Sequence, residues 1–503
     1  MFVYPKLVMH WMDNGEFLWD SRLFEKFNPA TGAPMAKVAG ADEKIVDAAI
    51  GVATVAFDGW RITSLEKRVE IIRNAAKVMD VHKEDIAGAV ALEAGWSKKR
   101  ALSDVKAAIQ LARFWMSWSR DIGQFEVPHG LSTDTPNRLV YTMRVPRGVC
   151  VAITPFNTPF SGVARKIFPA ILCGNTVVQK SHELTPYSAI MFAQVLKEAG
   201  LPSGVFSVVQ GLGKEIGSKL VTDPCIACIA FTGSQSTGEW IAKNARTNLV
   251  QLELGGKNPL VVCGDADIDH AVSSAIASAF VDSGQRCAAA SRIIIFDSVY
   301  DVFRKRFIEK MAALRPGVGD DADFGPVISL EHKQRIERVV TESLERGGTV
   351  YEGGNFSRDN YEAPHTWDDN GYYVRPKVIE NISPLDSISR NEIFGPVTSF
   401  FRVSDYEEAL ALANDSEYGL TAAIHTKNKE WQRDFTLRCQ SGVVRVNGPT
   451  HGSEPHMPFV GIKASGNGWA DTSDEAIKFY SQTRQISEDT VAEEGKDNVS
   501  RQA

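Results

Sequence analysis

The spacing of apolar residues changes along this chain at about residue 148. Residues 42–123 repeat apolar side chains three or four positions apart, which places them on one face of a helix. Two such stripes are Ala48, Val52, Val55 and Ala56, and Val69, Ile72, Ala76 and Met79. From residue 149 onward, short apolar runs alternate with helical patterns instead. The pattern therefore predicts an amino-terminal helical segment followed by repeated strand–helix units.

The strand–helix units fall into two sets. The first set has apolar strands at 148–153, 176–179, 205–209 and 225–231, with helical patterns at 160–173, 185–198 and 214–222 between them. The second set has strands at 259–263 and 292–296 and helices at 268–281, 299–314, 330–346 and 407–414. Such alternation predicts parallel sheets covered by helices on both faces, the usual platform for a dinucleotide. Two sets predict two α/β domains.

Composition narrows the class of protein. A chain of 503 residues is too long for a single hydrophobic core. With 44% hydrophobic and 23% charged residues, it has the composition of a soluble globular protein. A net charge of -7 gives no reason to expect nucleic acid or an anionic membrane as a partner. No signal-peptide pattern opens the chain and no apolar run reaches about 18 residues, so we expect a cytoplasmic protein.

The seven cysteines are scattered through apolar stretches, which is typical of buried thiols in a reducing compartment. Cys225 and Cys228 form a Cys-x-x-Cys pair, but no second pair and no histidine cluster accompany them. The pair also lies in a strand-like run. We therefore expect no metal site.

Cys287 differs from the other cysteines, because small residues follow it in the string Ser-Gly-Gln-Arg-Cys-Ala-Ala-Ala-Ser-Arg at 283–292. This setting indicates a nucleophile rather than half of a disulfide. Earlier in the chain, Glu253 stands just before the pair Gly255-Gly256. A thiol and a carboxylate are the two groups needed to form a thioester and then hydrolyse it.

A glycine-rich string at Gly211, Gly213 and Gly217 follows a strand, as in a dinucleotide-binding fingerprint. Its last spacing is one residue too long, and the next strand ends at Gly233-Ser234 rather than at an acidic residue. The string is weak evidence by itself. Ser234 opens a helix, where it would either meet a pyrophosphate or simply cap the helix.

Four further strings complete a set of six in a fixed order. They are Pro-Phe-Asn-Thr-Pro at 155–159, Val-Gln-Lys-Ser-His-Glu-Leu-Thr-Pro at 178–186, Glu-Ile-Phe-Gly-Pro-Val at 392–397 and Pro-Phe-Val-Gly-Ile-Lys-Ala-Ser-Gly at 458–466. Together with the Glu253 and Cys287 strings, they resemble the NAD(P)-dependent aldehyde dehydrogenase superfamily over residues 24–487.

The resemblance implies an α/β fold of the aldehyde dehydrogenase type, with four parts. These are a doubly wound cofactor domain (1–123 and 148–254), a second α/β catalytic domain (255–470), a small β oligomerisation arm (124–147 and 471–487) and a polar tail (488–503). The alternating strand from Arg138 to Arg144 would pair with a neighbouring subunit, so we expect a homodimer or homotetramer.

The resemblance also implies the catalytic roles. Cys287 would attack a small-molecule aldehyde, and Asn157 with the Cys287 N–H would bind the oxyanion. After hydride transfer to the nicotinamide, Glu253 would activate the water that hydrolyses the thioester. Lys166 would support the site. Asn157 lies between two prolines, so a plain turn residue is the alternative.

The cofactor residues follow from the same resemblance. Lys180 and Glu183 would bind the adenosine ribose, Ser234 the pyrophosphate, and Glu392 the nicotinamide ribose with Phe394 beside it. Phe156, Gly213 and Gly233 also belong to this implied site. Glu392 as a surface acid and Phe394 as a core residue are the alternatives. The carboxylate of Glu183 favours NAD over NADP, whereas His182, which departs from the family pattern, leaves NADP open.

The resemblance places Thr158, Gly162 and Arg165 with Phe156 along the aldehyde tunnel. Arg165 is similar to the arginine of succinate-semialdehyde dehydrogenases that clamps a distal carboxylate, so we favour a carboxylate-bearing semialdehyde. An aromatic aldehyde is the alternative, because residues 446–451 resemble vanillin- and salicylaldehyde-type dehydrogenases. In that comparison His451 lies near the tunnel mouth, or else on the surface.

Two rival functions belong to other classes. CoA-acylating aldehyde dehydrogenases generally lack the base at position 253, so Glu253 favours hydrolysis. A non-enzymatic binding protein on the same fold is hard to reconcile with a chain that retains Cys287, Glu253 and Asn157.

Overall fold

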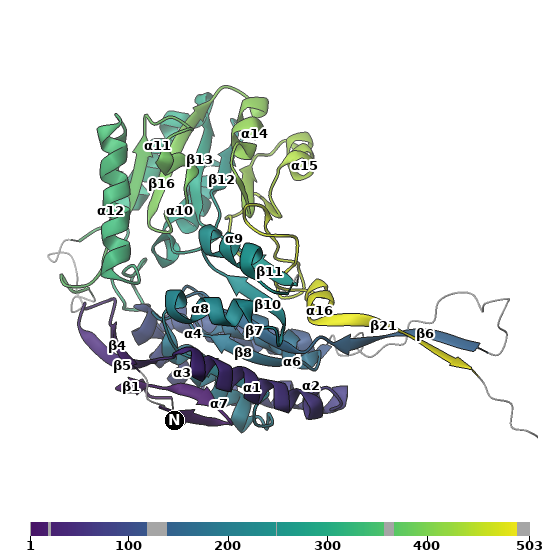
Figure 1. Ribbon diagram of the computed structural model, residues 1–503. Coiled ribbons are helices and arrows are strands. Elements are labelled where there is room, and N and C mark those ends of the chain that lie inside the picture. Colours follow the sequence, from purple (N-terminus) through teal and green to yellow (C-terminus); the bar gives the residue numbers. More distant parts are fainter. Residues whose placement is uncertain (1, 19–21, 118–137, 248, 357–366, 490–503) are drawn as a thin grey trace, which may run out of the picture.

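The computed structural model describes residues 2–18, 22–117, 138–247, 249–356 and 367–489. Two α/β units lie one above the other, and a long two-stranded ribbon projects from their side (Figure 1). No helix in the described part of the chain is both long and apolar enough to cross a bilayer.

The first unit is built on a seven-stranded sheet with the order β11-β10-β7-β8-β9-β2-β3. Its strands are β7 (Val149–Ile153), β8 (Thr176–Lys180), β9 (Phe206–Val209), β10 (Ile226–Thr232) and β11 (Val250–Glu253), which run parallel. The short β2 (His10–Met12) and β3 (Gly15–Phe17) extend it antiparallel. The strands that the apolar runs predict up to residue 231 are therefore present.

Helices cover both faces of this sheet, as a doubly wound fold requires. One core contains side chains of α1 (Glu43–Trp60), α8 (Gly213–Thr222) and α9 (Gln235–Asn244). The other contains side chains of α2 (Leu65–Val81), α3 (Lys83–Ala94), α4 (Lys98–Ser117), α6 (Ser161–Leu172) and α7 (Pro186–Glu198). A small separate sheet, β1 (Leu7–Val8), β5 (Pro34–Gly40) and β4 (Arg22–Phe27), lies beside this unit.

One of the two predicted helical stripes is buried and the other is not. Val69, Ile72, Ala76 and Met79 of α2 all lie in the core. In α1, however, Val55 is 79% exposed, and the buried face runs through Ile45, Ala49 and Ala53. The small Ala49 and Ala53 let α1 approach the sheet closely, where Thr176 donates a hydrogen bond to the Ala53 carbonyl at 2.9 Å. The predicted stripe of Ala48, Val52, Val55 and Ala56 therefore lies one position away from the face of α1 that is buried.

The second unit is another seven-stranded sheet, with the order β14-β15-β16-β13-β12-β18-β19. Its strands are β12 (Asn258–Val262), β13 (Ala290–Phe296), β14 (Thr349–Glu352), β15 (Lys377–Glu380), β16 (Val397–Val403), β18 (Thr421–His425) and β19 (Val443–Val446). All pairings are parallel except that of β14 with β15.

Helices also cover both faces of this second sheet. Side chains of α10 (Ile268–Phe280) and α11 (Asp297–Ala312) fill one core, and those of α14 (Tyr406–Asn414) and α15 (Lys429–Arg438) fill the opposite one. α12 (Leu330–Glu345) and α13 (Ser387–Arg390) pack near β15. β17 (Tyr418–Gly419) pairs with β20 (Ile462–Lys463) at the margin.

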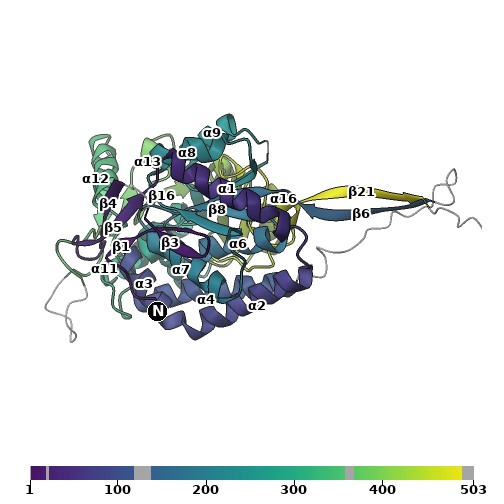
Figure 2. The same cartoon turned by 60° about the horizontal axis from the view of Figure 1, so that its bottom comes forward.

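The ribbon consists of β6 (Arg138–Pro146) and β21 (Ser481–Asp489), paired antiparallel along their whole length. Figure 2 shows from a second direction that it projects away from both units. The predicted oligomerisation arm covers this ribbon except for residues 488–489, which were placed in the tail, and its residues 124–137 lie outside the described residues. The short helix α16 (Glu475–Tyr480), included in that prediction, instead packs on α6. Residues 490–503, which make up most of the predicted tail, also lie outside the described residues.

Candidate active site

A cavity of about 1340 Å³ lies where the two units meet. The carboxyl ends of β7, β8, β10 and β11 face it from the first unit, and the segments that enter β13 and β16 face it from the second. The predicted site residues that line it are Phe156, Asn157, Lys180, Glu183, Gly213, Gly233, Ser234, Glu253, Cys287, Glu392 and Phe394. Arg165, Lys166, Thr158, Gly162 and His451 do not line it.

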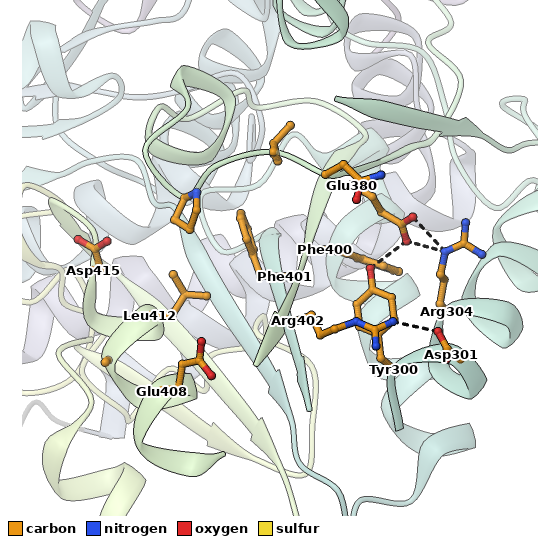
Figure 3. Close-up of a pocket in the computed structure, with 14 residues that line it drawn as sticks. Tyr300, Asp301, Arg304, Glu380, Phe400, Phe401, Arg402, Glu408, Leu412 and Asp415 are labelled. Atoms are coloured by element: carbon orange, nitrogen blue, oxygen red, sulfur yellow. Dashed lines mark hydrogen bonds and ion pairs between the residues drawn. The ribbon is translucent and has the colours of Figure 1, made fainter. Parts of the chain in front are cut away.

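A second hollow, of about 940 Å³, lies at the carboxyl edge of the second sheet and contains none of the predicted residues. Figure 3 shows that Glu380 binds Tyr300 and Arg304 and that Arg402 binds Asp301. Glu380 accepts hydrogen bonds from Tyr300 at 3.1 Å and from Arg304 at 2.7 Å. The Arg402 guanidinium lies 4.0 Å from the ring centre of Tyr300. Glu380, Arg304 and Arg402 therefore already have partners within the hollow.

Cys287 is partly buried in the loop that enters β13. Burial raises the pKa of its thiol to about 12, the nearby Glu392 and Glu253 add to this rise, and Arg165 opposes it. The thiol is therefore protonated at neutral pH in this state. The side chain of Asn258 holds the loop by donating to the Cys287 carbonyl at 2.7 Å.

The three residues at 282–284, just before the nucleophile, adopt the left-handed conformation. Asp282, Ser283 and Gly284 have φ angles of 55°, 56° and 66°. At Gly284 a Cβ would lie 2.2 Å from the Gly395 carbonyl oxygen, so only glycine fits. The left-handed region is unfavourable for Asp and Ser, so surrounding contacts must hold this turn in place.

Those contacts come from both units. The buried carboxylate of Asp282 binds Nε of Arg100 on α4 at 2.7 Å and Nε of Arg286 at 2.6 Å. The Ser283 hydroxyl donates to the Gly325 carbonyl at 2.5 Å, and Asn157 donates through Nδ2 to the Gln285 carbonyl at 3.0 Å. Neither Asp282 nor Arg100 was predicted from the sequence. The only indication of a special turn was the run of turn-forming residues Asp-Ser-Gly before Cys287.

Glu253 ends β11 and is 3% exposed. Neither of its carboxylate oxygens has a hydrogen-bond partner among the described residues. Burial raises the pKa of this carboxyl well above its usual value and Asp471 raises it further, against the effects of Lys166 and Arg165. A carboxyl group in this state becomes a strong base once it loses its proton.

Lys166 and Arg165, on α6, do not line this cavity, and they share one carboxylate. Lys166 Nζ lies 2.9 Å from Asp471 Oδ1, and Arg165 Nε lies 3.6 Å from Asp471 Oδ2. The Arg165 guanidinium also lies 5.6 Å from the ring centre of Phe459. Asp471 was not among the predicted site residues, and the predicted boundary at 471 placed it in the oligomerisation element. Its carboxylate instead belongs to this charged group.

The other two predicted substrate residues pack against each other. The Gly162 N–H donates to the Thr158 carbonyl at 2.8 Å, and a Cβ on Gly162 would lie 2.7 Å from Thr158 Oγ1. The space beside Gly162 is therefore already filled by Thr158.

His451 lies near the Cys287 loop, outside the cavity. Burial and the charge of Arg286 lower the pKa of its imidazole to about 4, whereas Asp282 opposes this shift. The ring is therefore neutral at pH 7.

At one end of the cavity, Lys180 Nζ and Glu183 Oε2 form an ion pair at 2.6 Å. Burial alone would raise the pKa of Glu183, but His182 and Lys180 lower it to about 2. Burial also lowers the pKa of His182 to about 4. His182 is therefore neutral at pH 7 and does not supply the positive charge that the sequence left open.

Two helices begin at this end of the cavity. α8 begins at Gly213, and Ser234 precedes α9, where its hydroxyl accepts a hydrogen bond from the Thr237 N–H at 3.4 Å. Ser234 thus caps the helix and also lines the cavity. A Cβ on Gly233 would lie 2.5 Å from the Phe231 ring. Two helix amino termini at one wall favour an anion there.

At the other end, Glu392 Oε1 accepts a hydrogen bond from the Gly256 N–H at 3.0 Å, and burial raises the pKa of this carboxyl to about 7. Phe394 has a φ of 57°, and its carbonyl binds Nε2 of His332 at 2.7 Å. Both predicted residues lie on the cavity wall, neither at the surface nor in the core. His332 and Arg335 of α12 also line this end and had not been predicted.

Comparison with known proteins gives one consistent family. Residues 18–486 match the model of the aldehyde dehydrogenase family. An aldehyde dehydrogenase of Davidiella tassiana is 36% identical over 485 residues, covering 94% of each chain. An alpha-ketoglutarate semialdehyde dehydrogenase of Haloferax volcanii is 34% identical, covering 93% of this chain and 96% of its own. A solved betaine aldehyde dehydrogenase of Staphylococcus aureus in complex with NAD+ has a TM-score of 0.88 at 28% identity, covering 95% of this chain and 94% of its own.

Proposed function

Because the chain belongs to the aldehyde dehydrogenase family, we propose that its NAD(P)-dependent oxidation of aldehydes acts on a semialdehyde that carries a carboxylate. The observation that carries the proposal is the charged group of Arg165, Lys166 and Asp471 beside Glu253. The Haloferax volcanii relative, whose name specifies alpha-ketoglutarate semialdehyde, supports the same class of substrate.

Arg165 does not line the cavity, but its side chain is 22% exposed and has the properties expected of a carboxylate clamp. Asp471 is shared by two cations, and its 3.6 Å contact with Arg165 is an ion pair rather than a hydrogen bond. A guanidinium has five N–H donors in a planar fork, which suits bidentate binding of a carboxylate. The charge of Arg165 also lowers the pKa of the Cys287 thiol, so the two groups lie close enough to interact electrostatically. The excess positive charge favours an anionic substrate.

The aromatic alternative rests on the likeness of residues 446–451 to vanillin- and salicylaldehyde-type dehydrogenases. The charged group around Arg165 favours a carboxylate over an uncharged ring, so we keep the carboxylated semialdehyde as the proposed substrate class.

The cavity residues fit NAD(P). Lys180 and Glu183 would hold the adenosine ribose, the amino termini of α8 and α9 the pyrophosphate, and Glu392 with Phe394 the nicotinamide ribose. When bound, the nicotinamide supplies the hydride acceptor. We propose NAD rather than NADP, because Glu183 is ionised and His182 is neutral at pH 7.

Cys287 is the nucleophile in this proposal, and it must first lose its proton. The Cys287 sulfur adds to the aldehyde carbon, and the second hydrogen of the Asn157 amide with the Cys287 N–H stabilises the oxyanion. Once hydride has left this carbon, a thioester remains on Cys287. Glu253, as carboxylate, then takes a proton from the water that hydrolyses it. A buried base at position 253 favours hydrolysis over transfer to CoA.

The ribbon of β6 and β21 supports the expectation of a homodimer or homotetramer. A two-stranded ribbon that projects from the body is a structure that can extend its pairing by strand addition to a second copy of the chain. Sedimentation analysis of the purified protein measures the state directly.

The substrate proposal is tested with matched aldehydes. We expect kcat/KM for succinic semialdehyde to exceed that for butyraldehyde about a hundredfold, or about 2.7 kcal/mol of transition-state binding. Arg165→Gln should remove this ratio while leaving butyraldehyde oxidation within a few-fold. Equal rates for the two aldehydes in the unmodified enzyme, or a preference for benzaldehyde, would contradict the proposal.

A further inference from the structure

Two cysteines that the mechanism does not use meet inside the first sheet. Cys150 of β7 and Cys228 of β10 are direct partners in the parallel register. Both are buried, and their sulfur atoms lie 2.8 Å apart. The contact joins positions 78 residues apart in the chain, so no local sequence motif indicates it.

The backbone at this point suits a disulfide. Neighbouring strands lie about 4.7–4.9 Å apart, which falls inside the Cα–Cα range of about 4.4–6.8 Å found in disulfides. The two sulfur atoms need to approach by about 0.8 Å to reach the bonded distance. Rotation of the two side chains supplies such a movement without displacement of the strands.

The Cys-x-x-Cys pair of the sequence is not the pair that meets. Cys225 is exposed and lies just before β10, where its N–H binds Asp223 Oδ1 at 2.9 Å. Cys228 lies within β10 instead, and its sulfur contacts that of Cys150. The position of Cys228 in β10 therefore separates it from Cys225 and gives it Cys150, on the neighbouring strand β7, as its partner.

We propose that Cys150 and Cys228 are a modification site, where a peroxide-class oxidant converts the two thiols into a reversible disulfide. One thiol, as thiolate, attacks a peroxide oxygen, which breaks the O–O bond, releases water and leaves a sulfenic acid. The second thiol attacks that sulfur and releases another water as the S–S bond forms. In total, two thiols lose two electrons and two protons, and one hydrogen peroxide becomes two waters.

The surroundings determine the rate of this step. Burial raises the pKa of Cys150 well above its usual value, and the Arg147 guanidinium only partly opposes the rise. The thiolate is therefore scarce at neutral pH, and oxidation is slower than at an exposed cysteine. A buried pair also requires an oxidant that is small and uncharged, which describes hydrogen peroxide.

The disulfide would join the two strands that lead into the cofactor cavity. β7 continues into Phe156 and Asn157, and β10 continues into Gly233 and Ser234, all of which line the cavity. A covalent link between the strands would restrain the two loops relative to each other. The proposal rests on the sulfur geometry and is independent of the proposed substrate.

The test uses the full chain with Cys287→Ser, so that the partly exposed thiol at 287 does not react. The protein is treated with hydrogen peroxide, then unfolded and alkylated, and its intact mass and non-reduced peptides are measured. We expect the loss of two hydrogen atoms, a linked pair of peptides containing residues 150 and 228, and full reversal by a phosphine. Adding Cys150→Ala should abolish the link, whereas adding Cys225→Ala should leave it intact.

Three results would overturn the proposal. They are full alkylation of both thiols after peroxide, linkage of either one to Cys173 or Cys225, and addition of oxygen without a link. If Cys150→Ala does not fold, peptide mapping of the Cys287→Ser protein alone decides among these results.

Discussion

The carboxylate of Asp282 accepts a hydrogen bond from Nε of Arg100 at 2.7 Å, which ties the loop of the nucleophile to helix α4 of the other unit. Asp282 is 4% exposed in its side chain, and Arg286 binds its second oxygen. The pair therefore stabilises a left-handed turn that the backbone alone would avoid. The position of Cys287 depends on a contact between the two units.

Asp282→Asn should destabilise the protein and impair the chemical step. An amide keeps the shape of the side chain but leaves the guanidinium groups of Arg100 and Arg286 without a counter-charge. Loss of one partner of a buried ion pair costs about 3 kcal/mol. We expect a lower urea midpoint and a kcat reduced at least about tenfold, with a much smaller change in KM. An unchanged kcat would show that the turn is held without this carboxylate. Asp301→Asn, at an exposed position of α11, serves as the control.

The same pair predicts an acid-sensitive term in stability. Arg100 and Arg286 outweigh the effect of burial and lower the pKa of Asp282 from 3.8 to about 2. Because the folded-state pKa is the lower one, the contribution of about 2 kcal/mol is complete above the unfolded pKa and is lost as the pH falls from about 4 to about 2. The difference in unfolding free energy between the unmodified protein and Asp282→Asn should therefore shrink over that window. A difference that stays constant down to pH 2 would contradict the assignment.

The parts of the site that sequence predicts are those encoded in short strings. Glu253 and Lys180 lie at the ends of apolar strands, and Asn157 and Cys287 lie next to strands, so locating the strands also located the residues. Arg100 and His332 come from segments far from those strings, and Asp471 follows the last string by five residues, but nothing local marks their side chains as site residues. Only tertiary packing brings His332 to the cavity wall, Arg100 to Asp282 and Asp471 to Lys166. The strands β1 to β5 were also missed, because β1, β2 and β3 are only two or three residues long and these segments have little apolar periodicity of their own.

The protonated state of Cys287 can be measured by alkylation without cofactor. Burial together with the charges of Glu392 and Glu253 raises the pKa of the thiol to about 12. The rate of iodoacetamide labelling of the Cys287 peptide should therefore rise about tenfold per pH unit from about pH 7 to about pH 10, without a plateau. Glu392→Gln removes a negative charge and should speed labelling at each pH above 8. Glu408→Gln, in the distant hollow, should have no effect. A plateau below about pH 9 would show that the thiol is activated already.

Glu253→Gln should separate acylation from hydrolysis. The amide cannot take a proton from water, so the thioester on Cys287 should persist. We expect steady-state kcat to fall at least about a hundredfold, while a single burst of NADH equal to the enzyme concentration remains. Intact mass after mixing with aldehyde and NAD should show an acyl adduct, and the Cys287→Ala protein should show none. Recovery of only unmodified Glu253→Gln protein would count against Glu253 as the hydrolytic base.

Glu183→Gln should shift the cofactor preference toward NADP. The Glu183 carboxylate is ionised at neutral pH because its pKa is about 2, and it would repel a 2′-phosphate placed near the adenosine ribose. Removing the charge should raise the ratio of kcat/KM for NADP over NAD by at least about tenfold, or about 1.4 kcal/mol. His182→Gln is the matched control, because the pKa of His182 is about 4 and the ring carries no charge at pH 7.5. A ratio that moves with His182→Gln but not with Glu183→Gln would transfer the selectivity from the carboxylate to the imidazole.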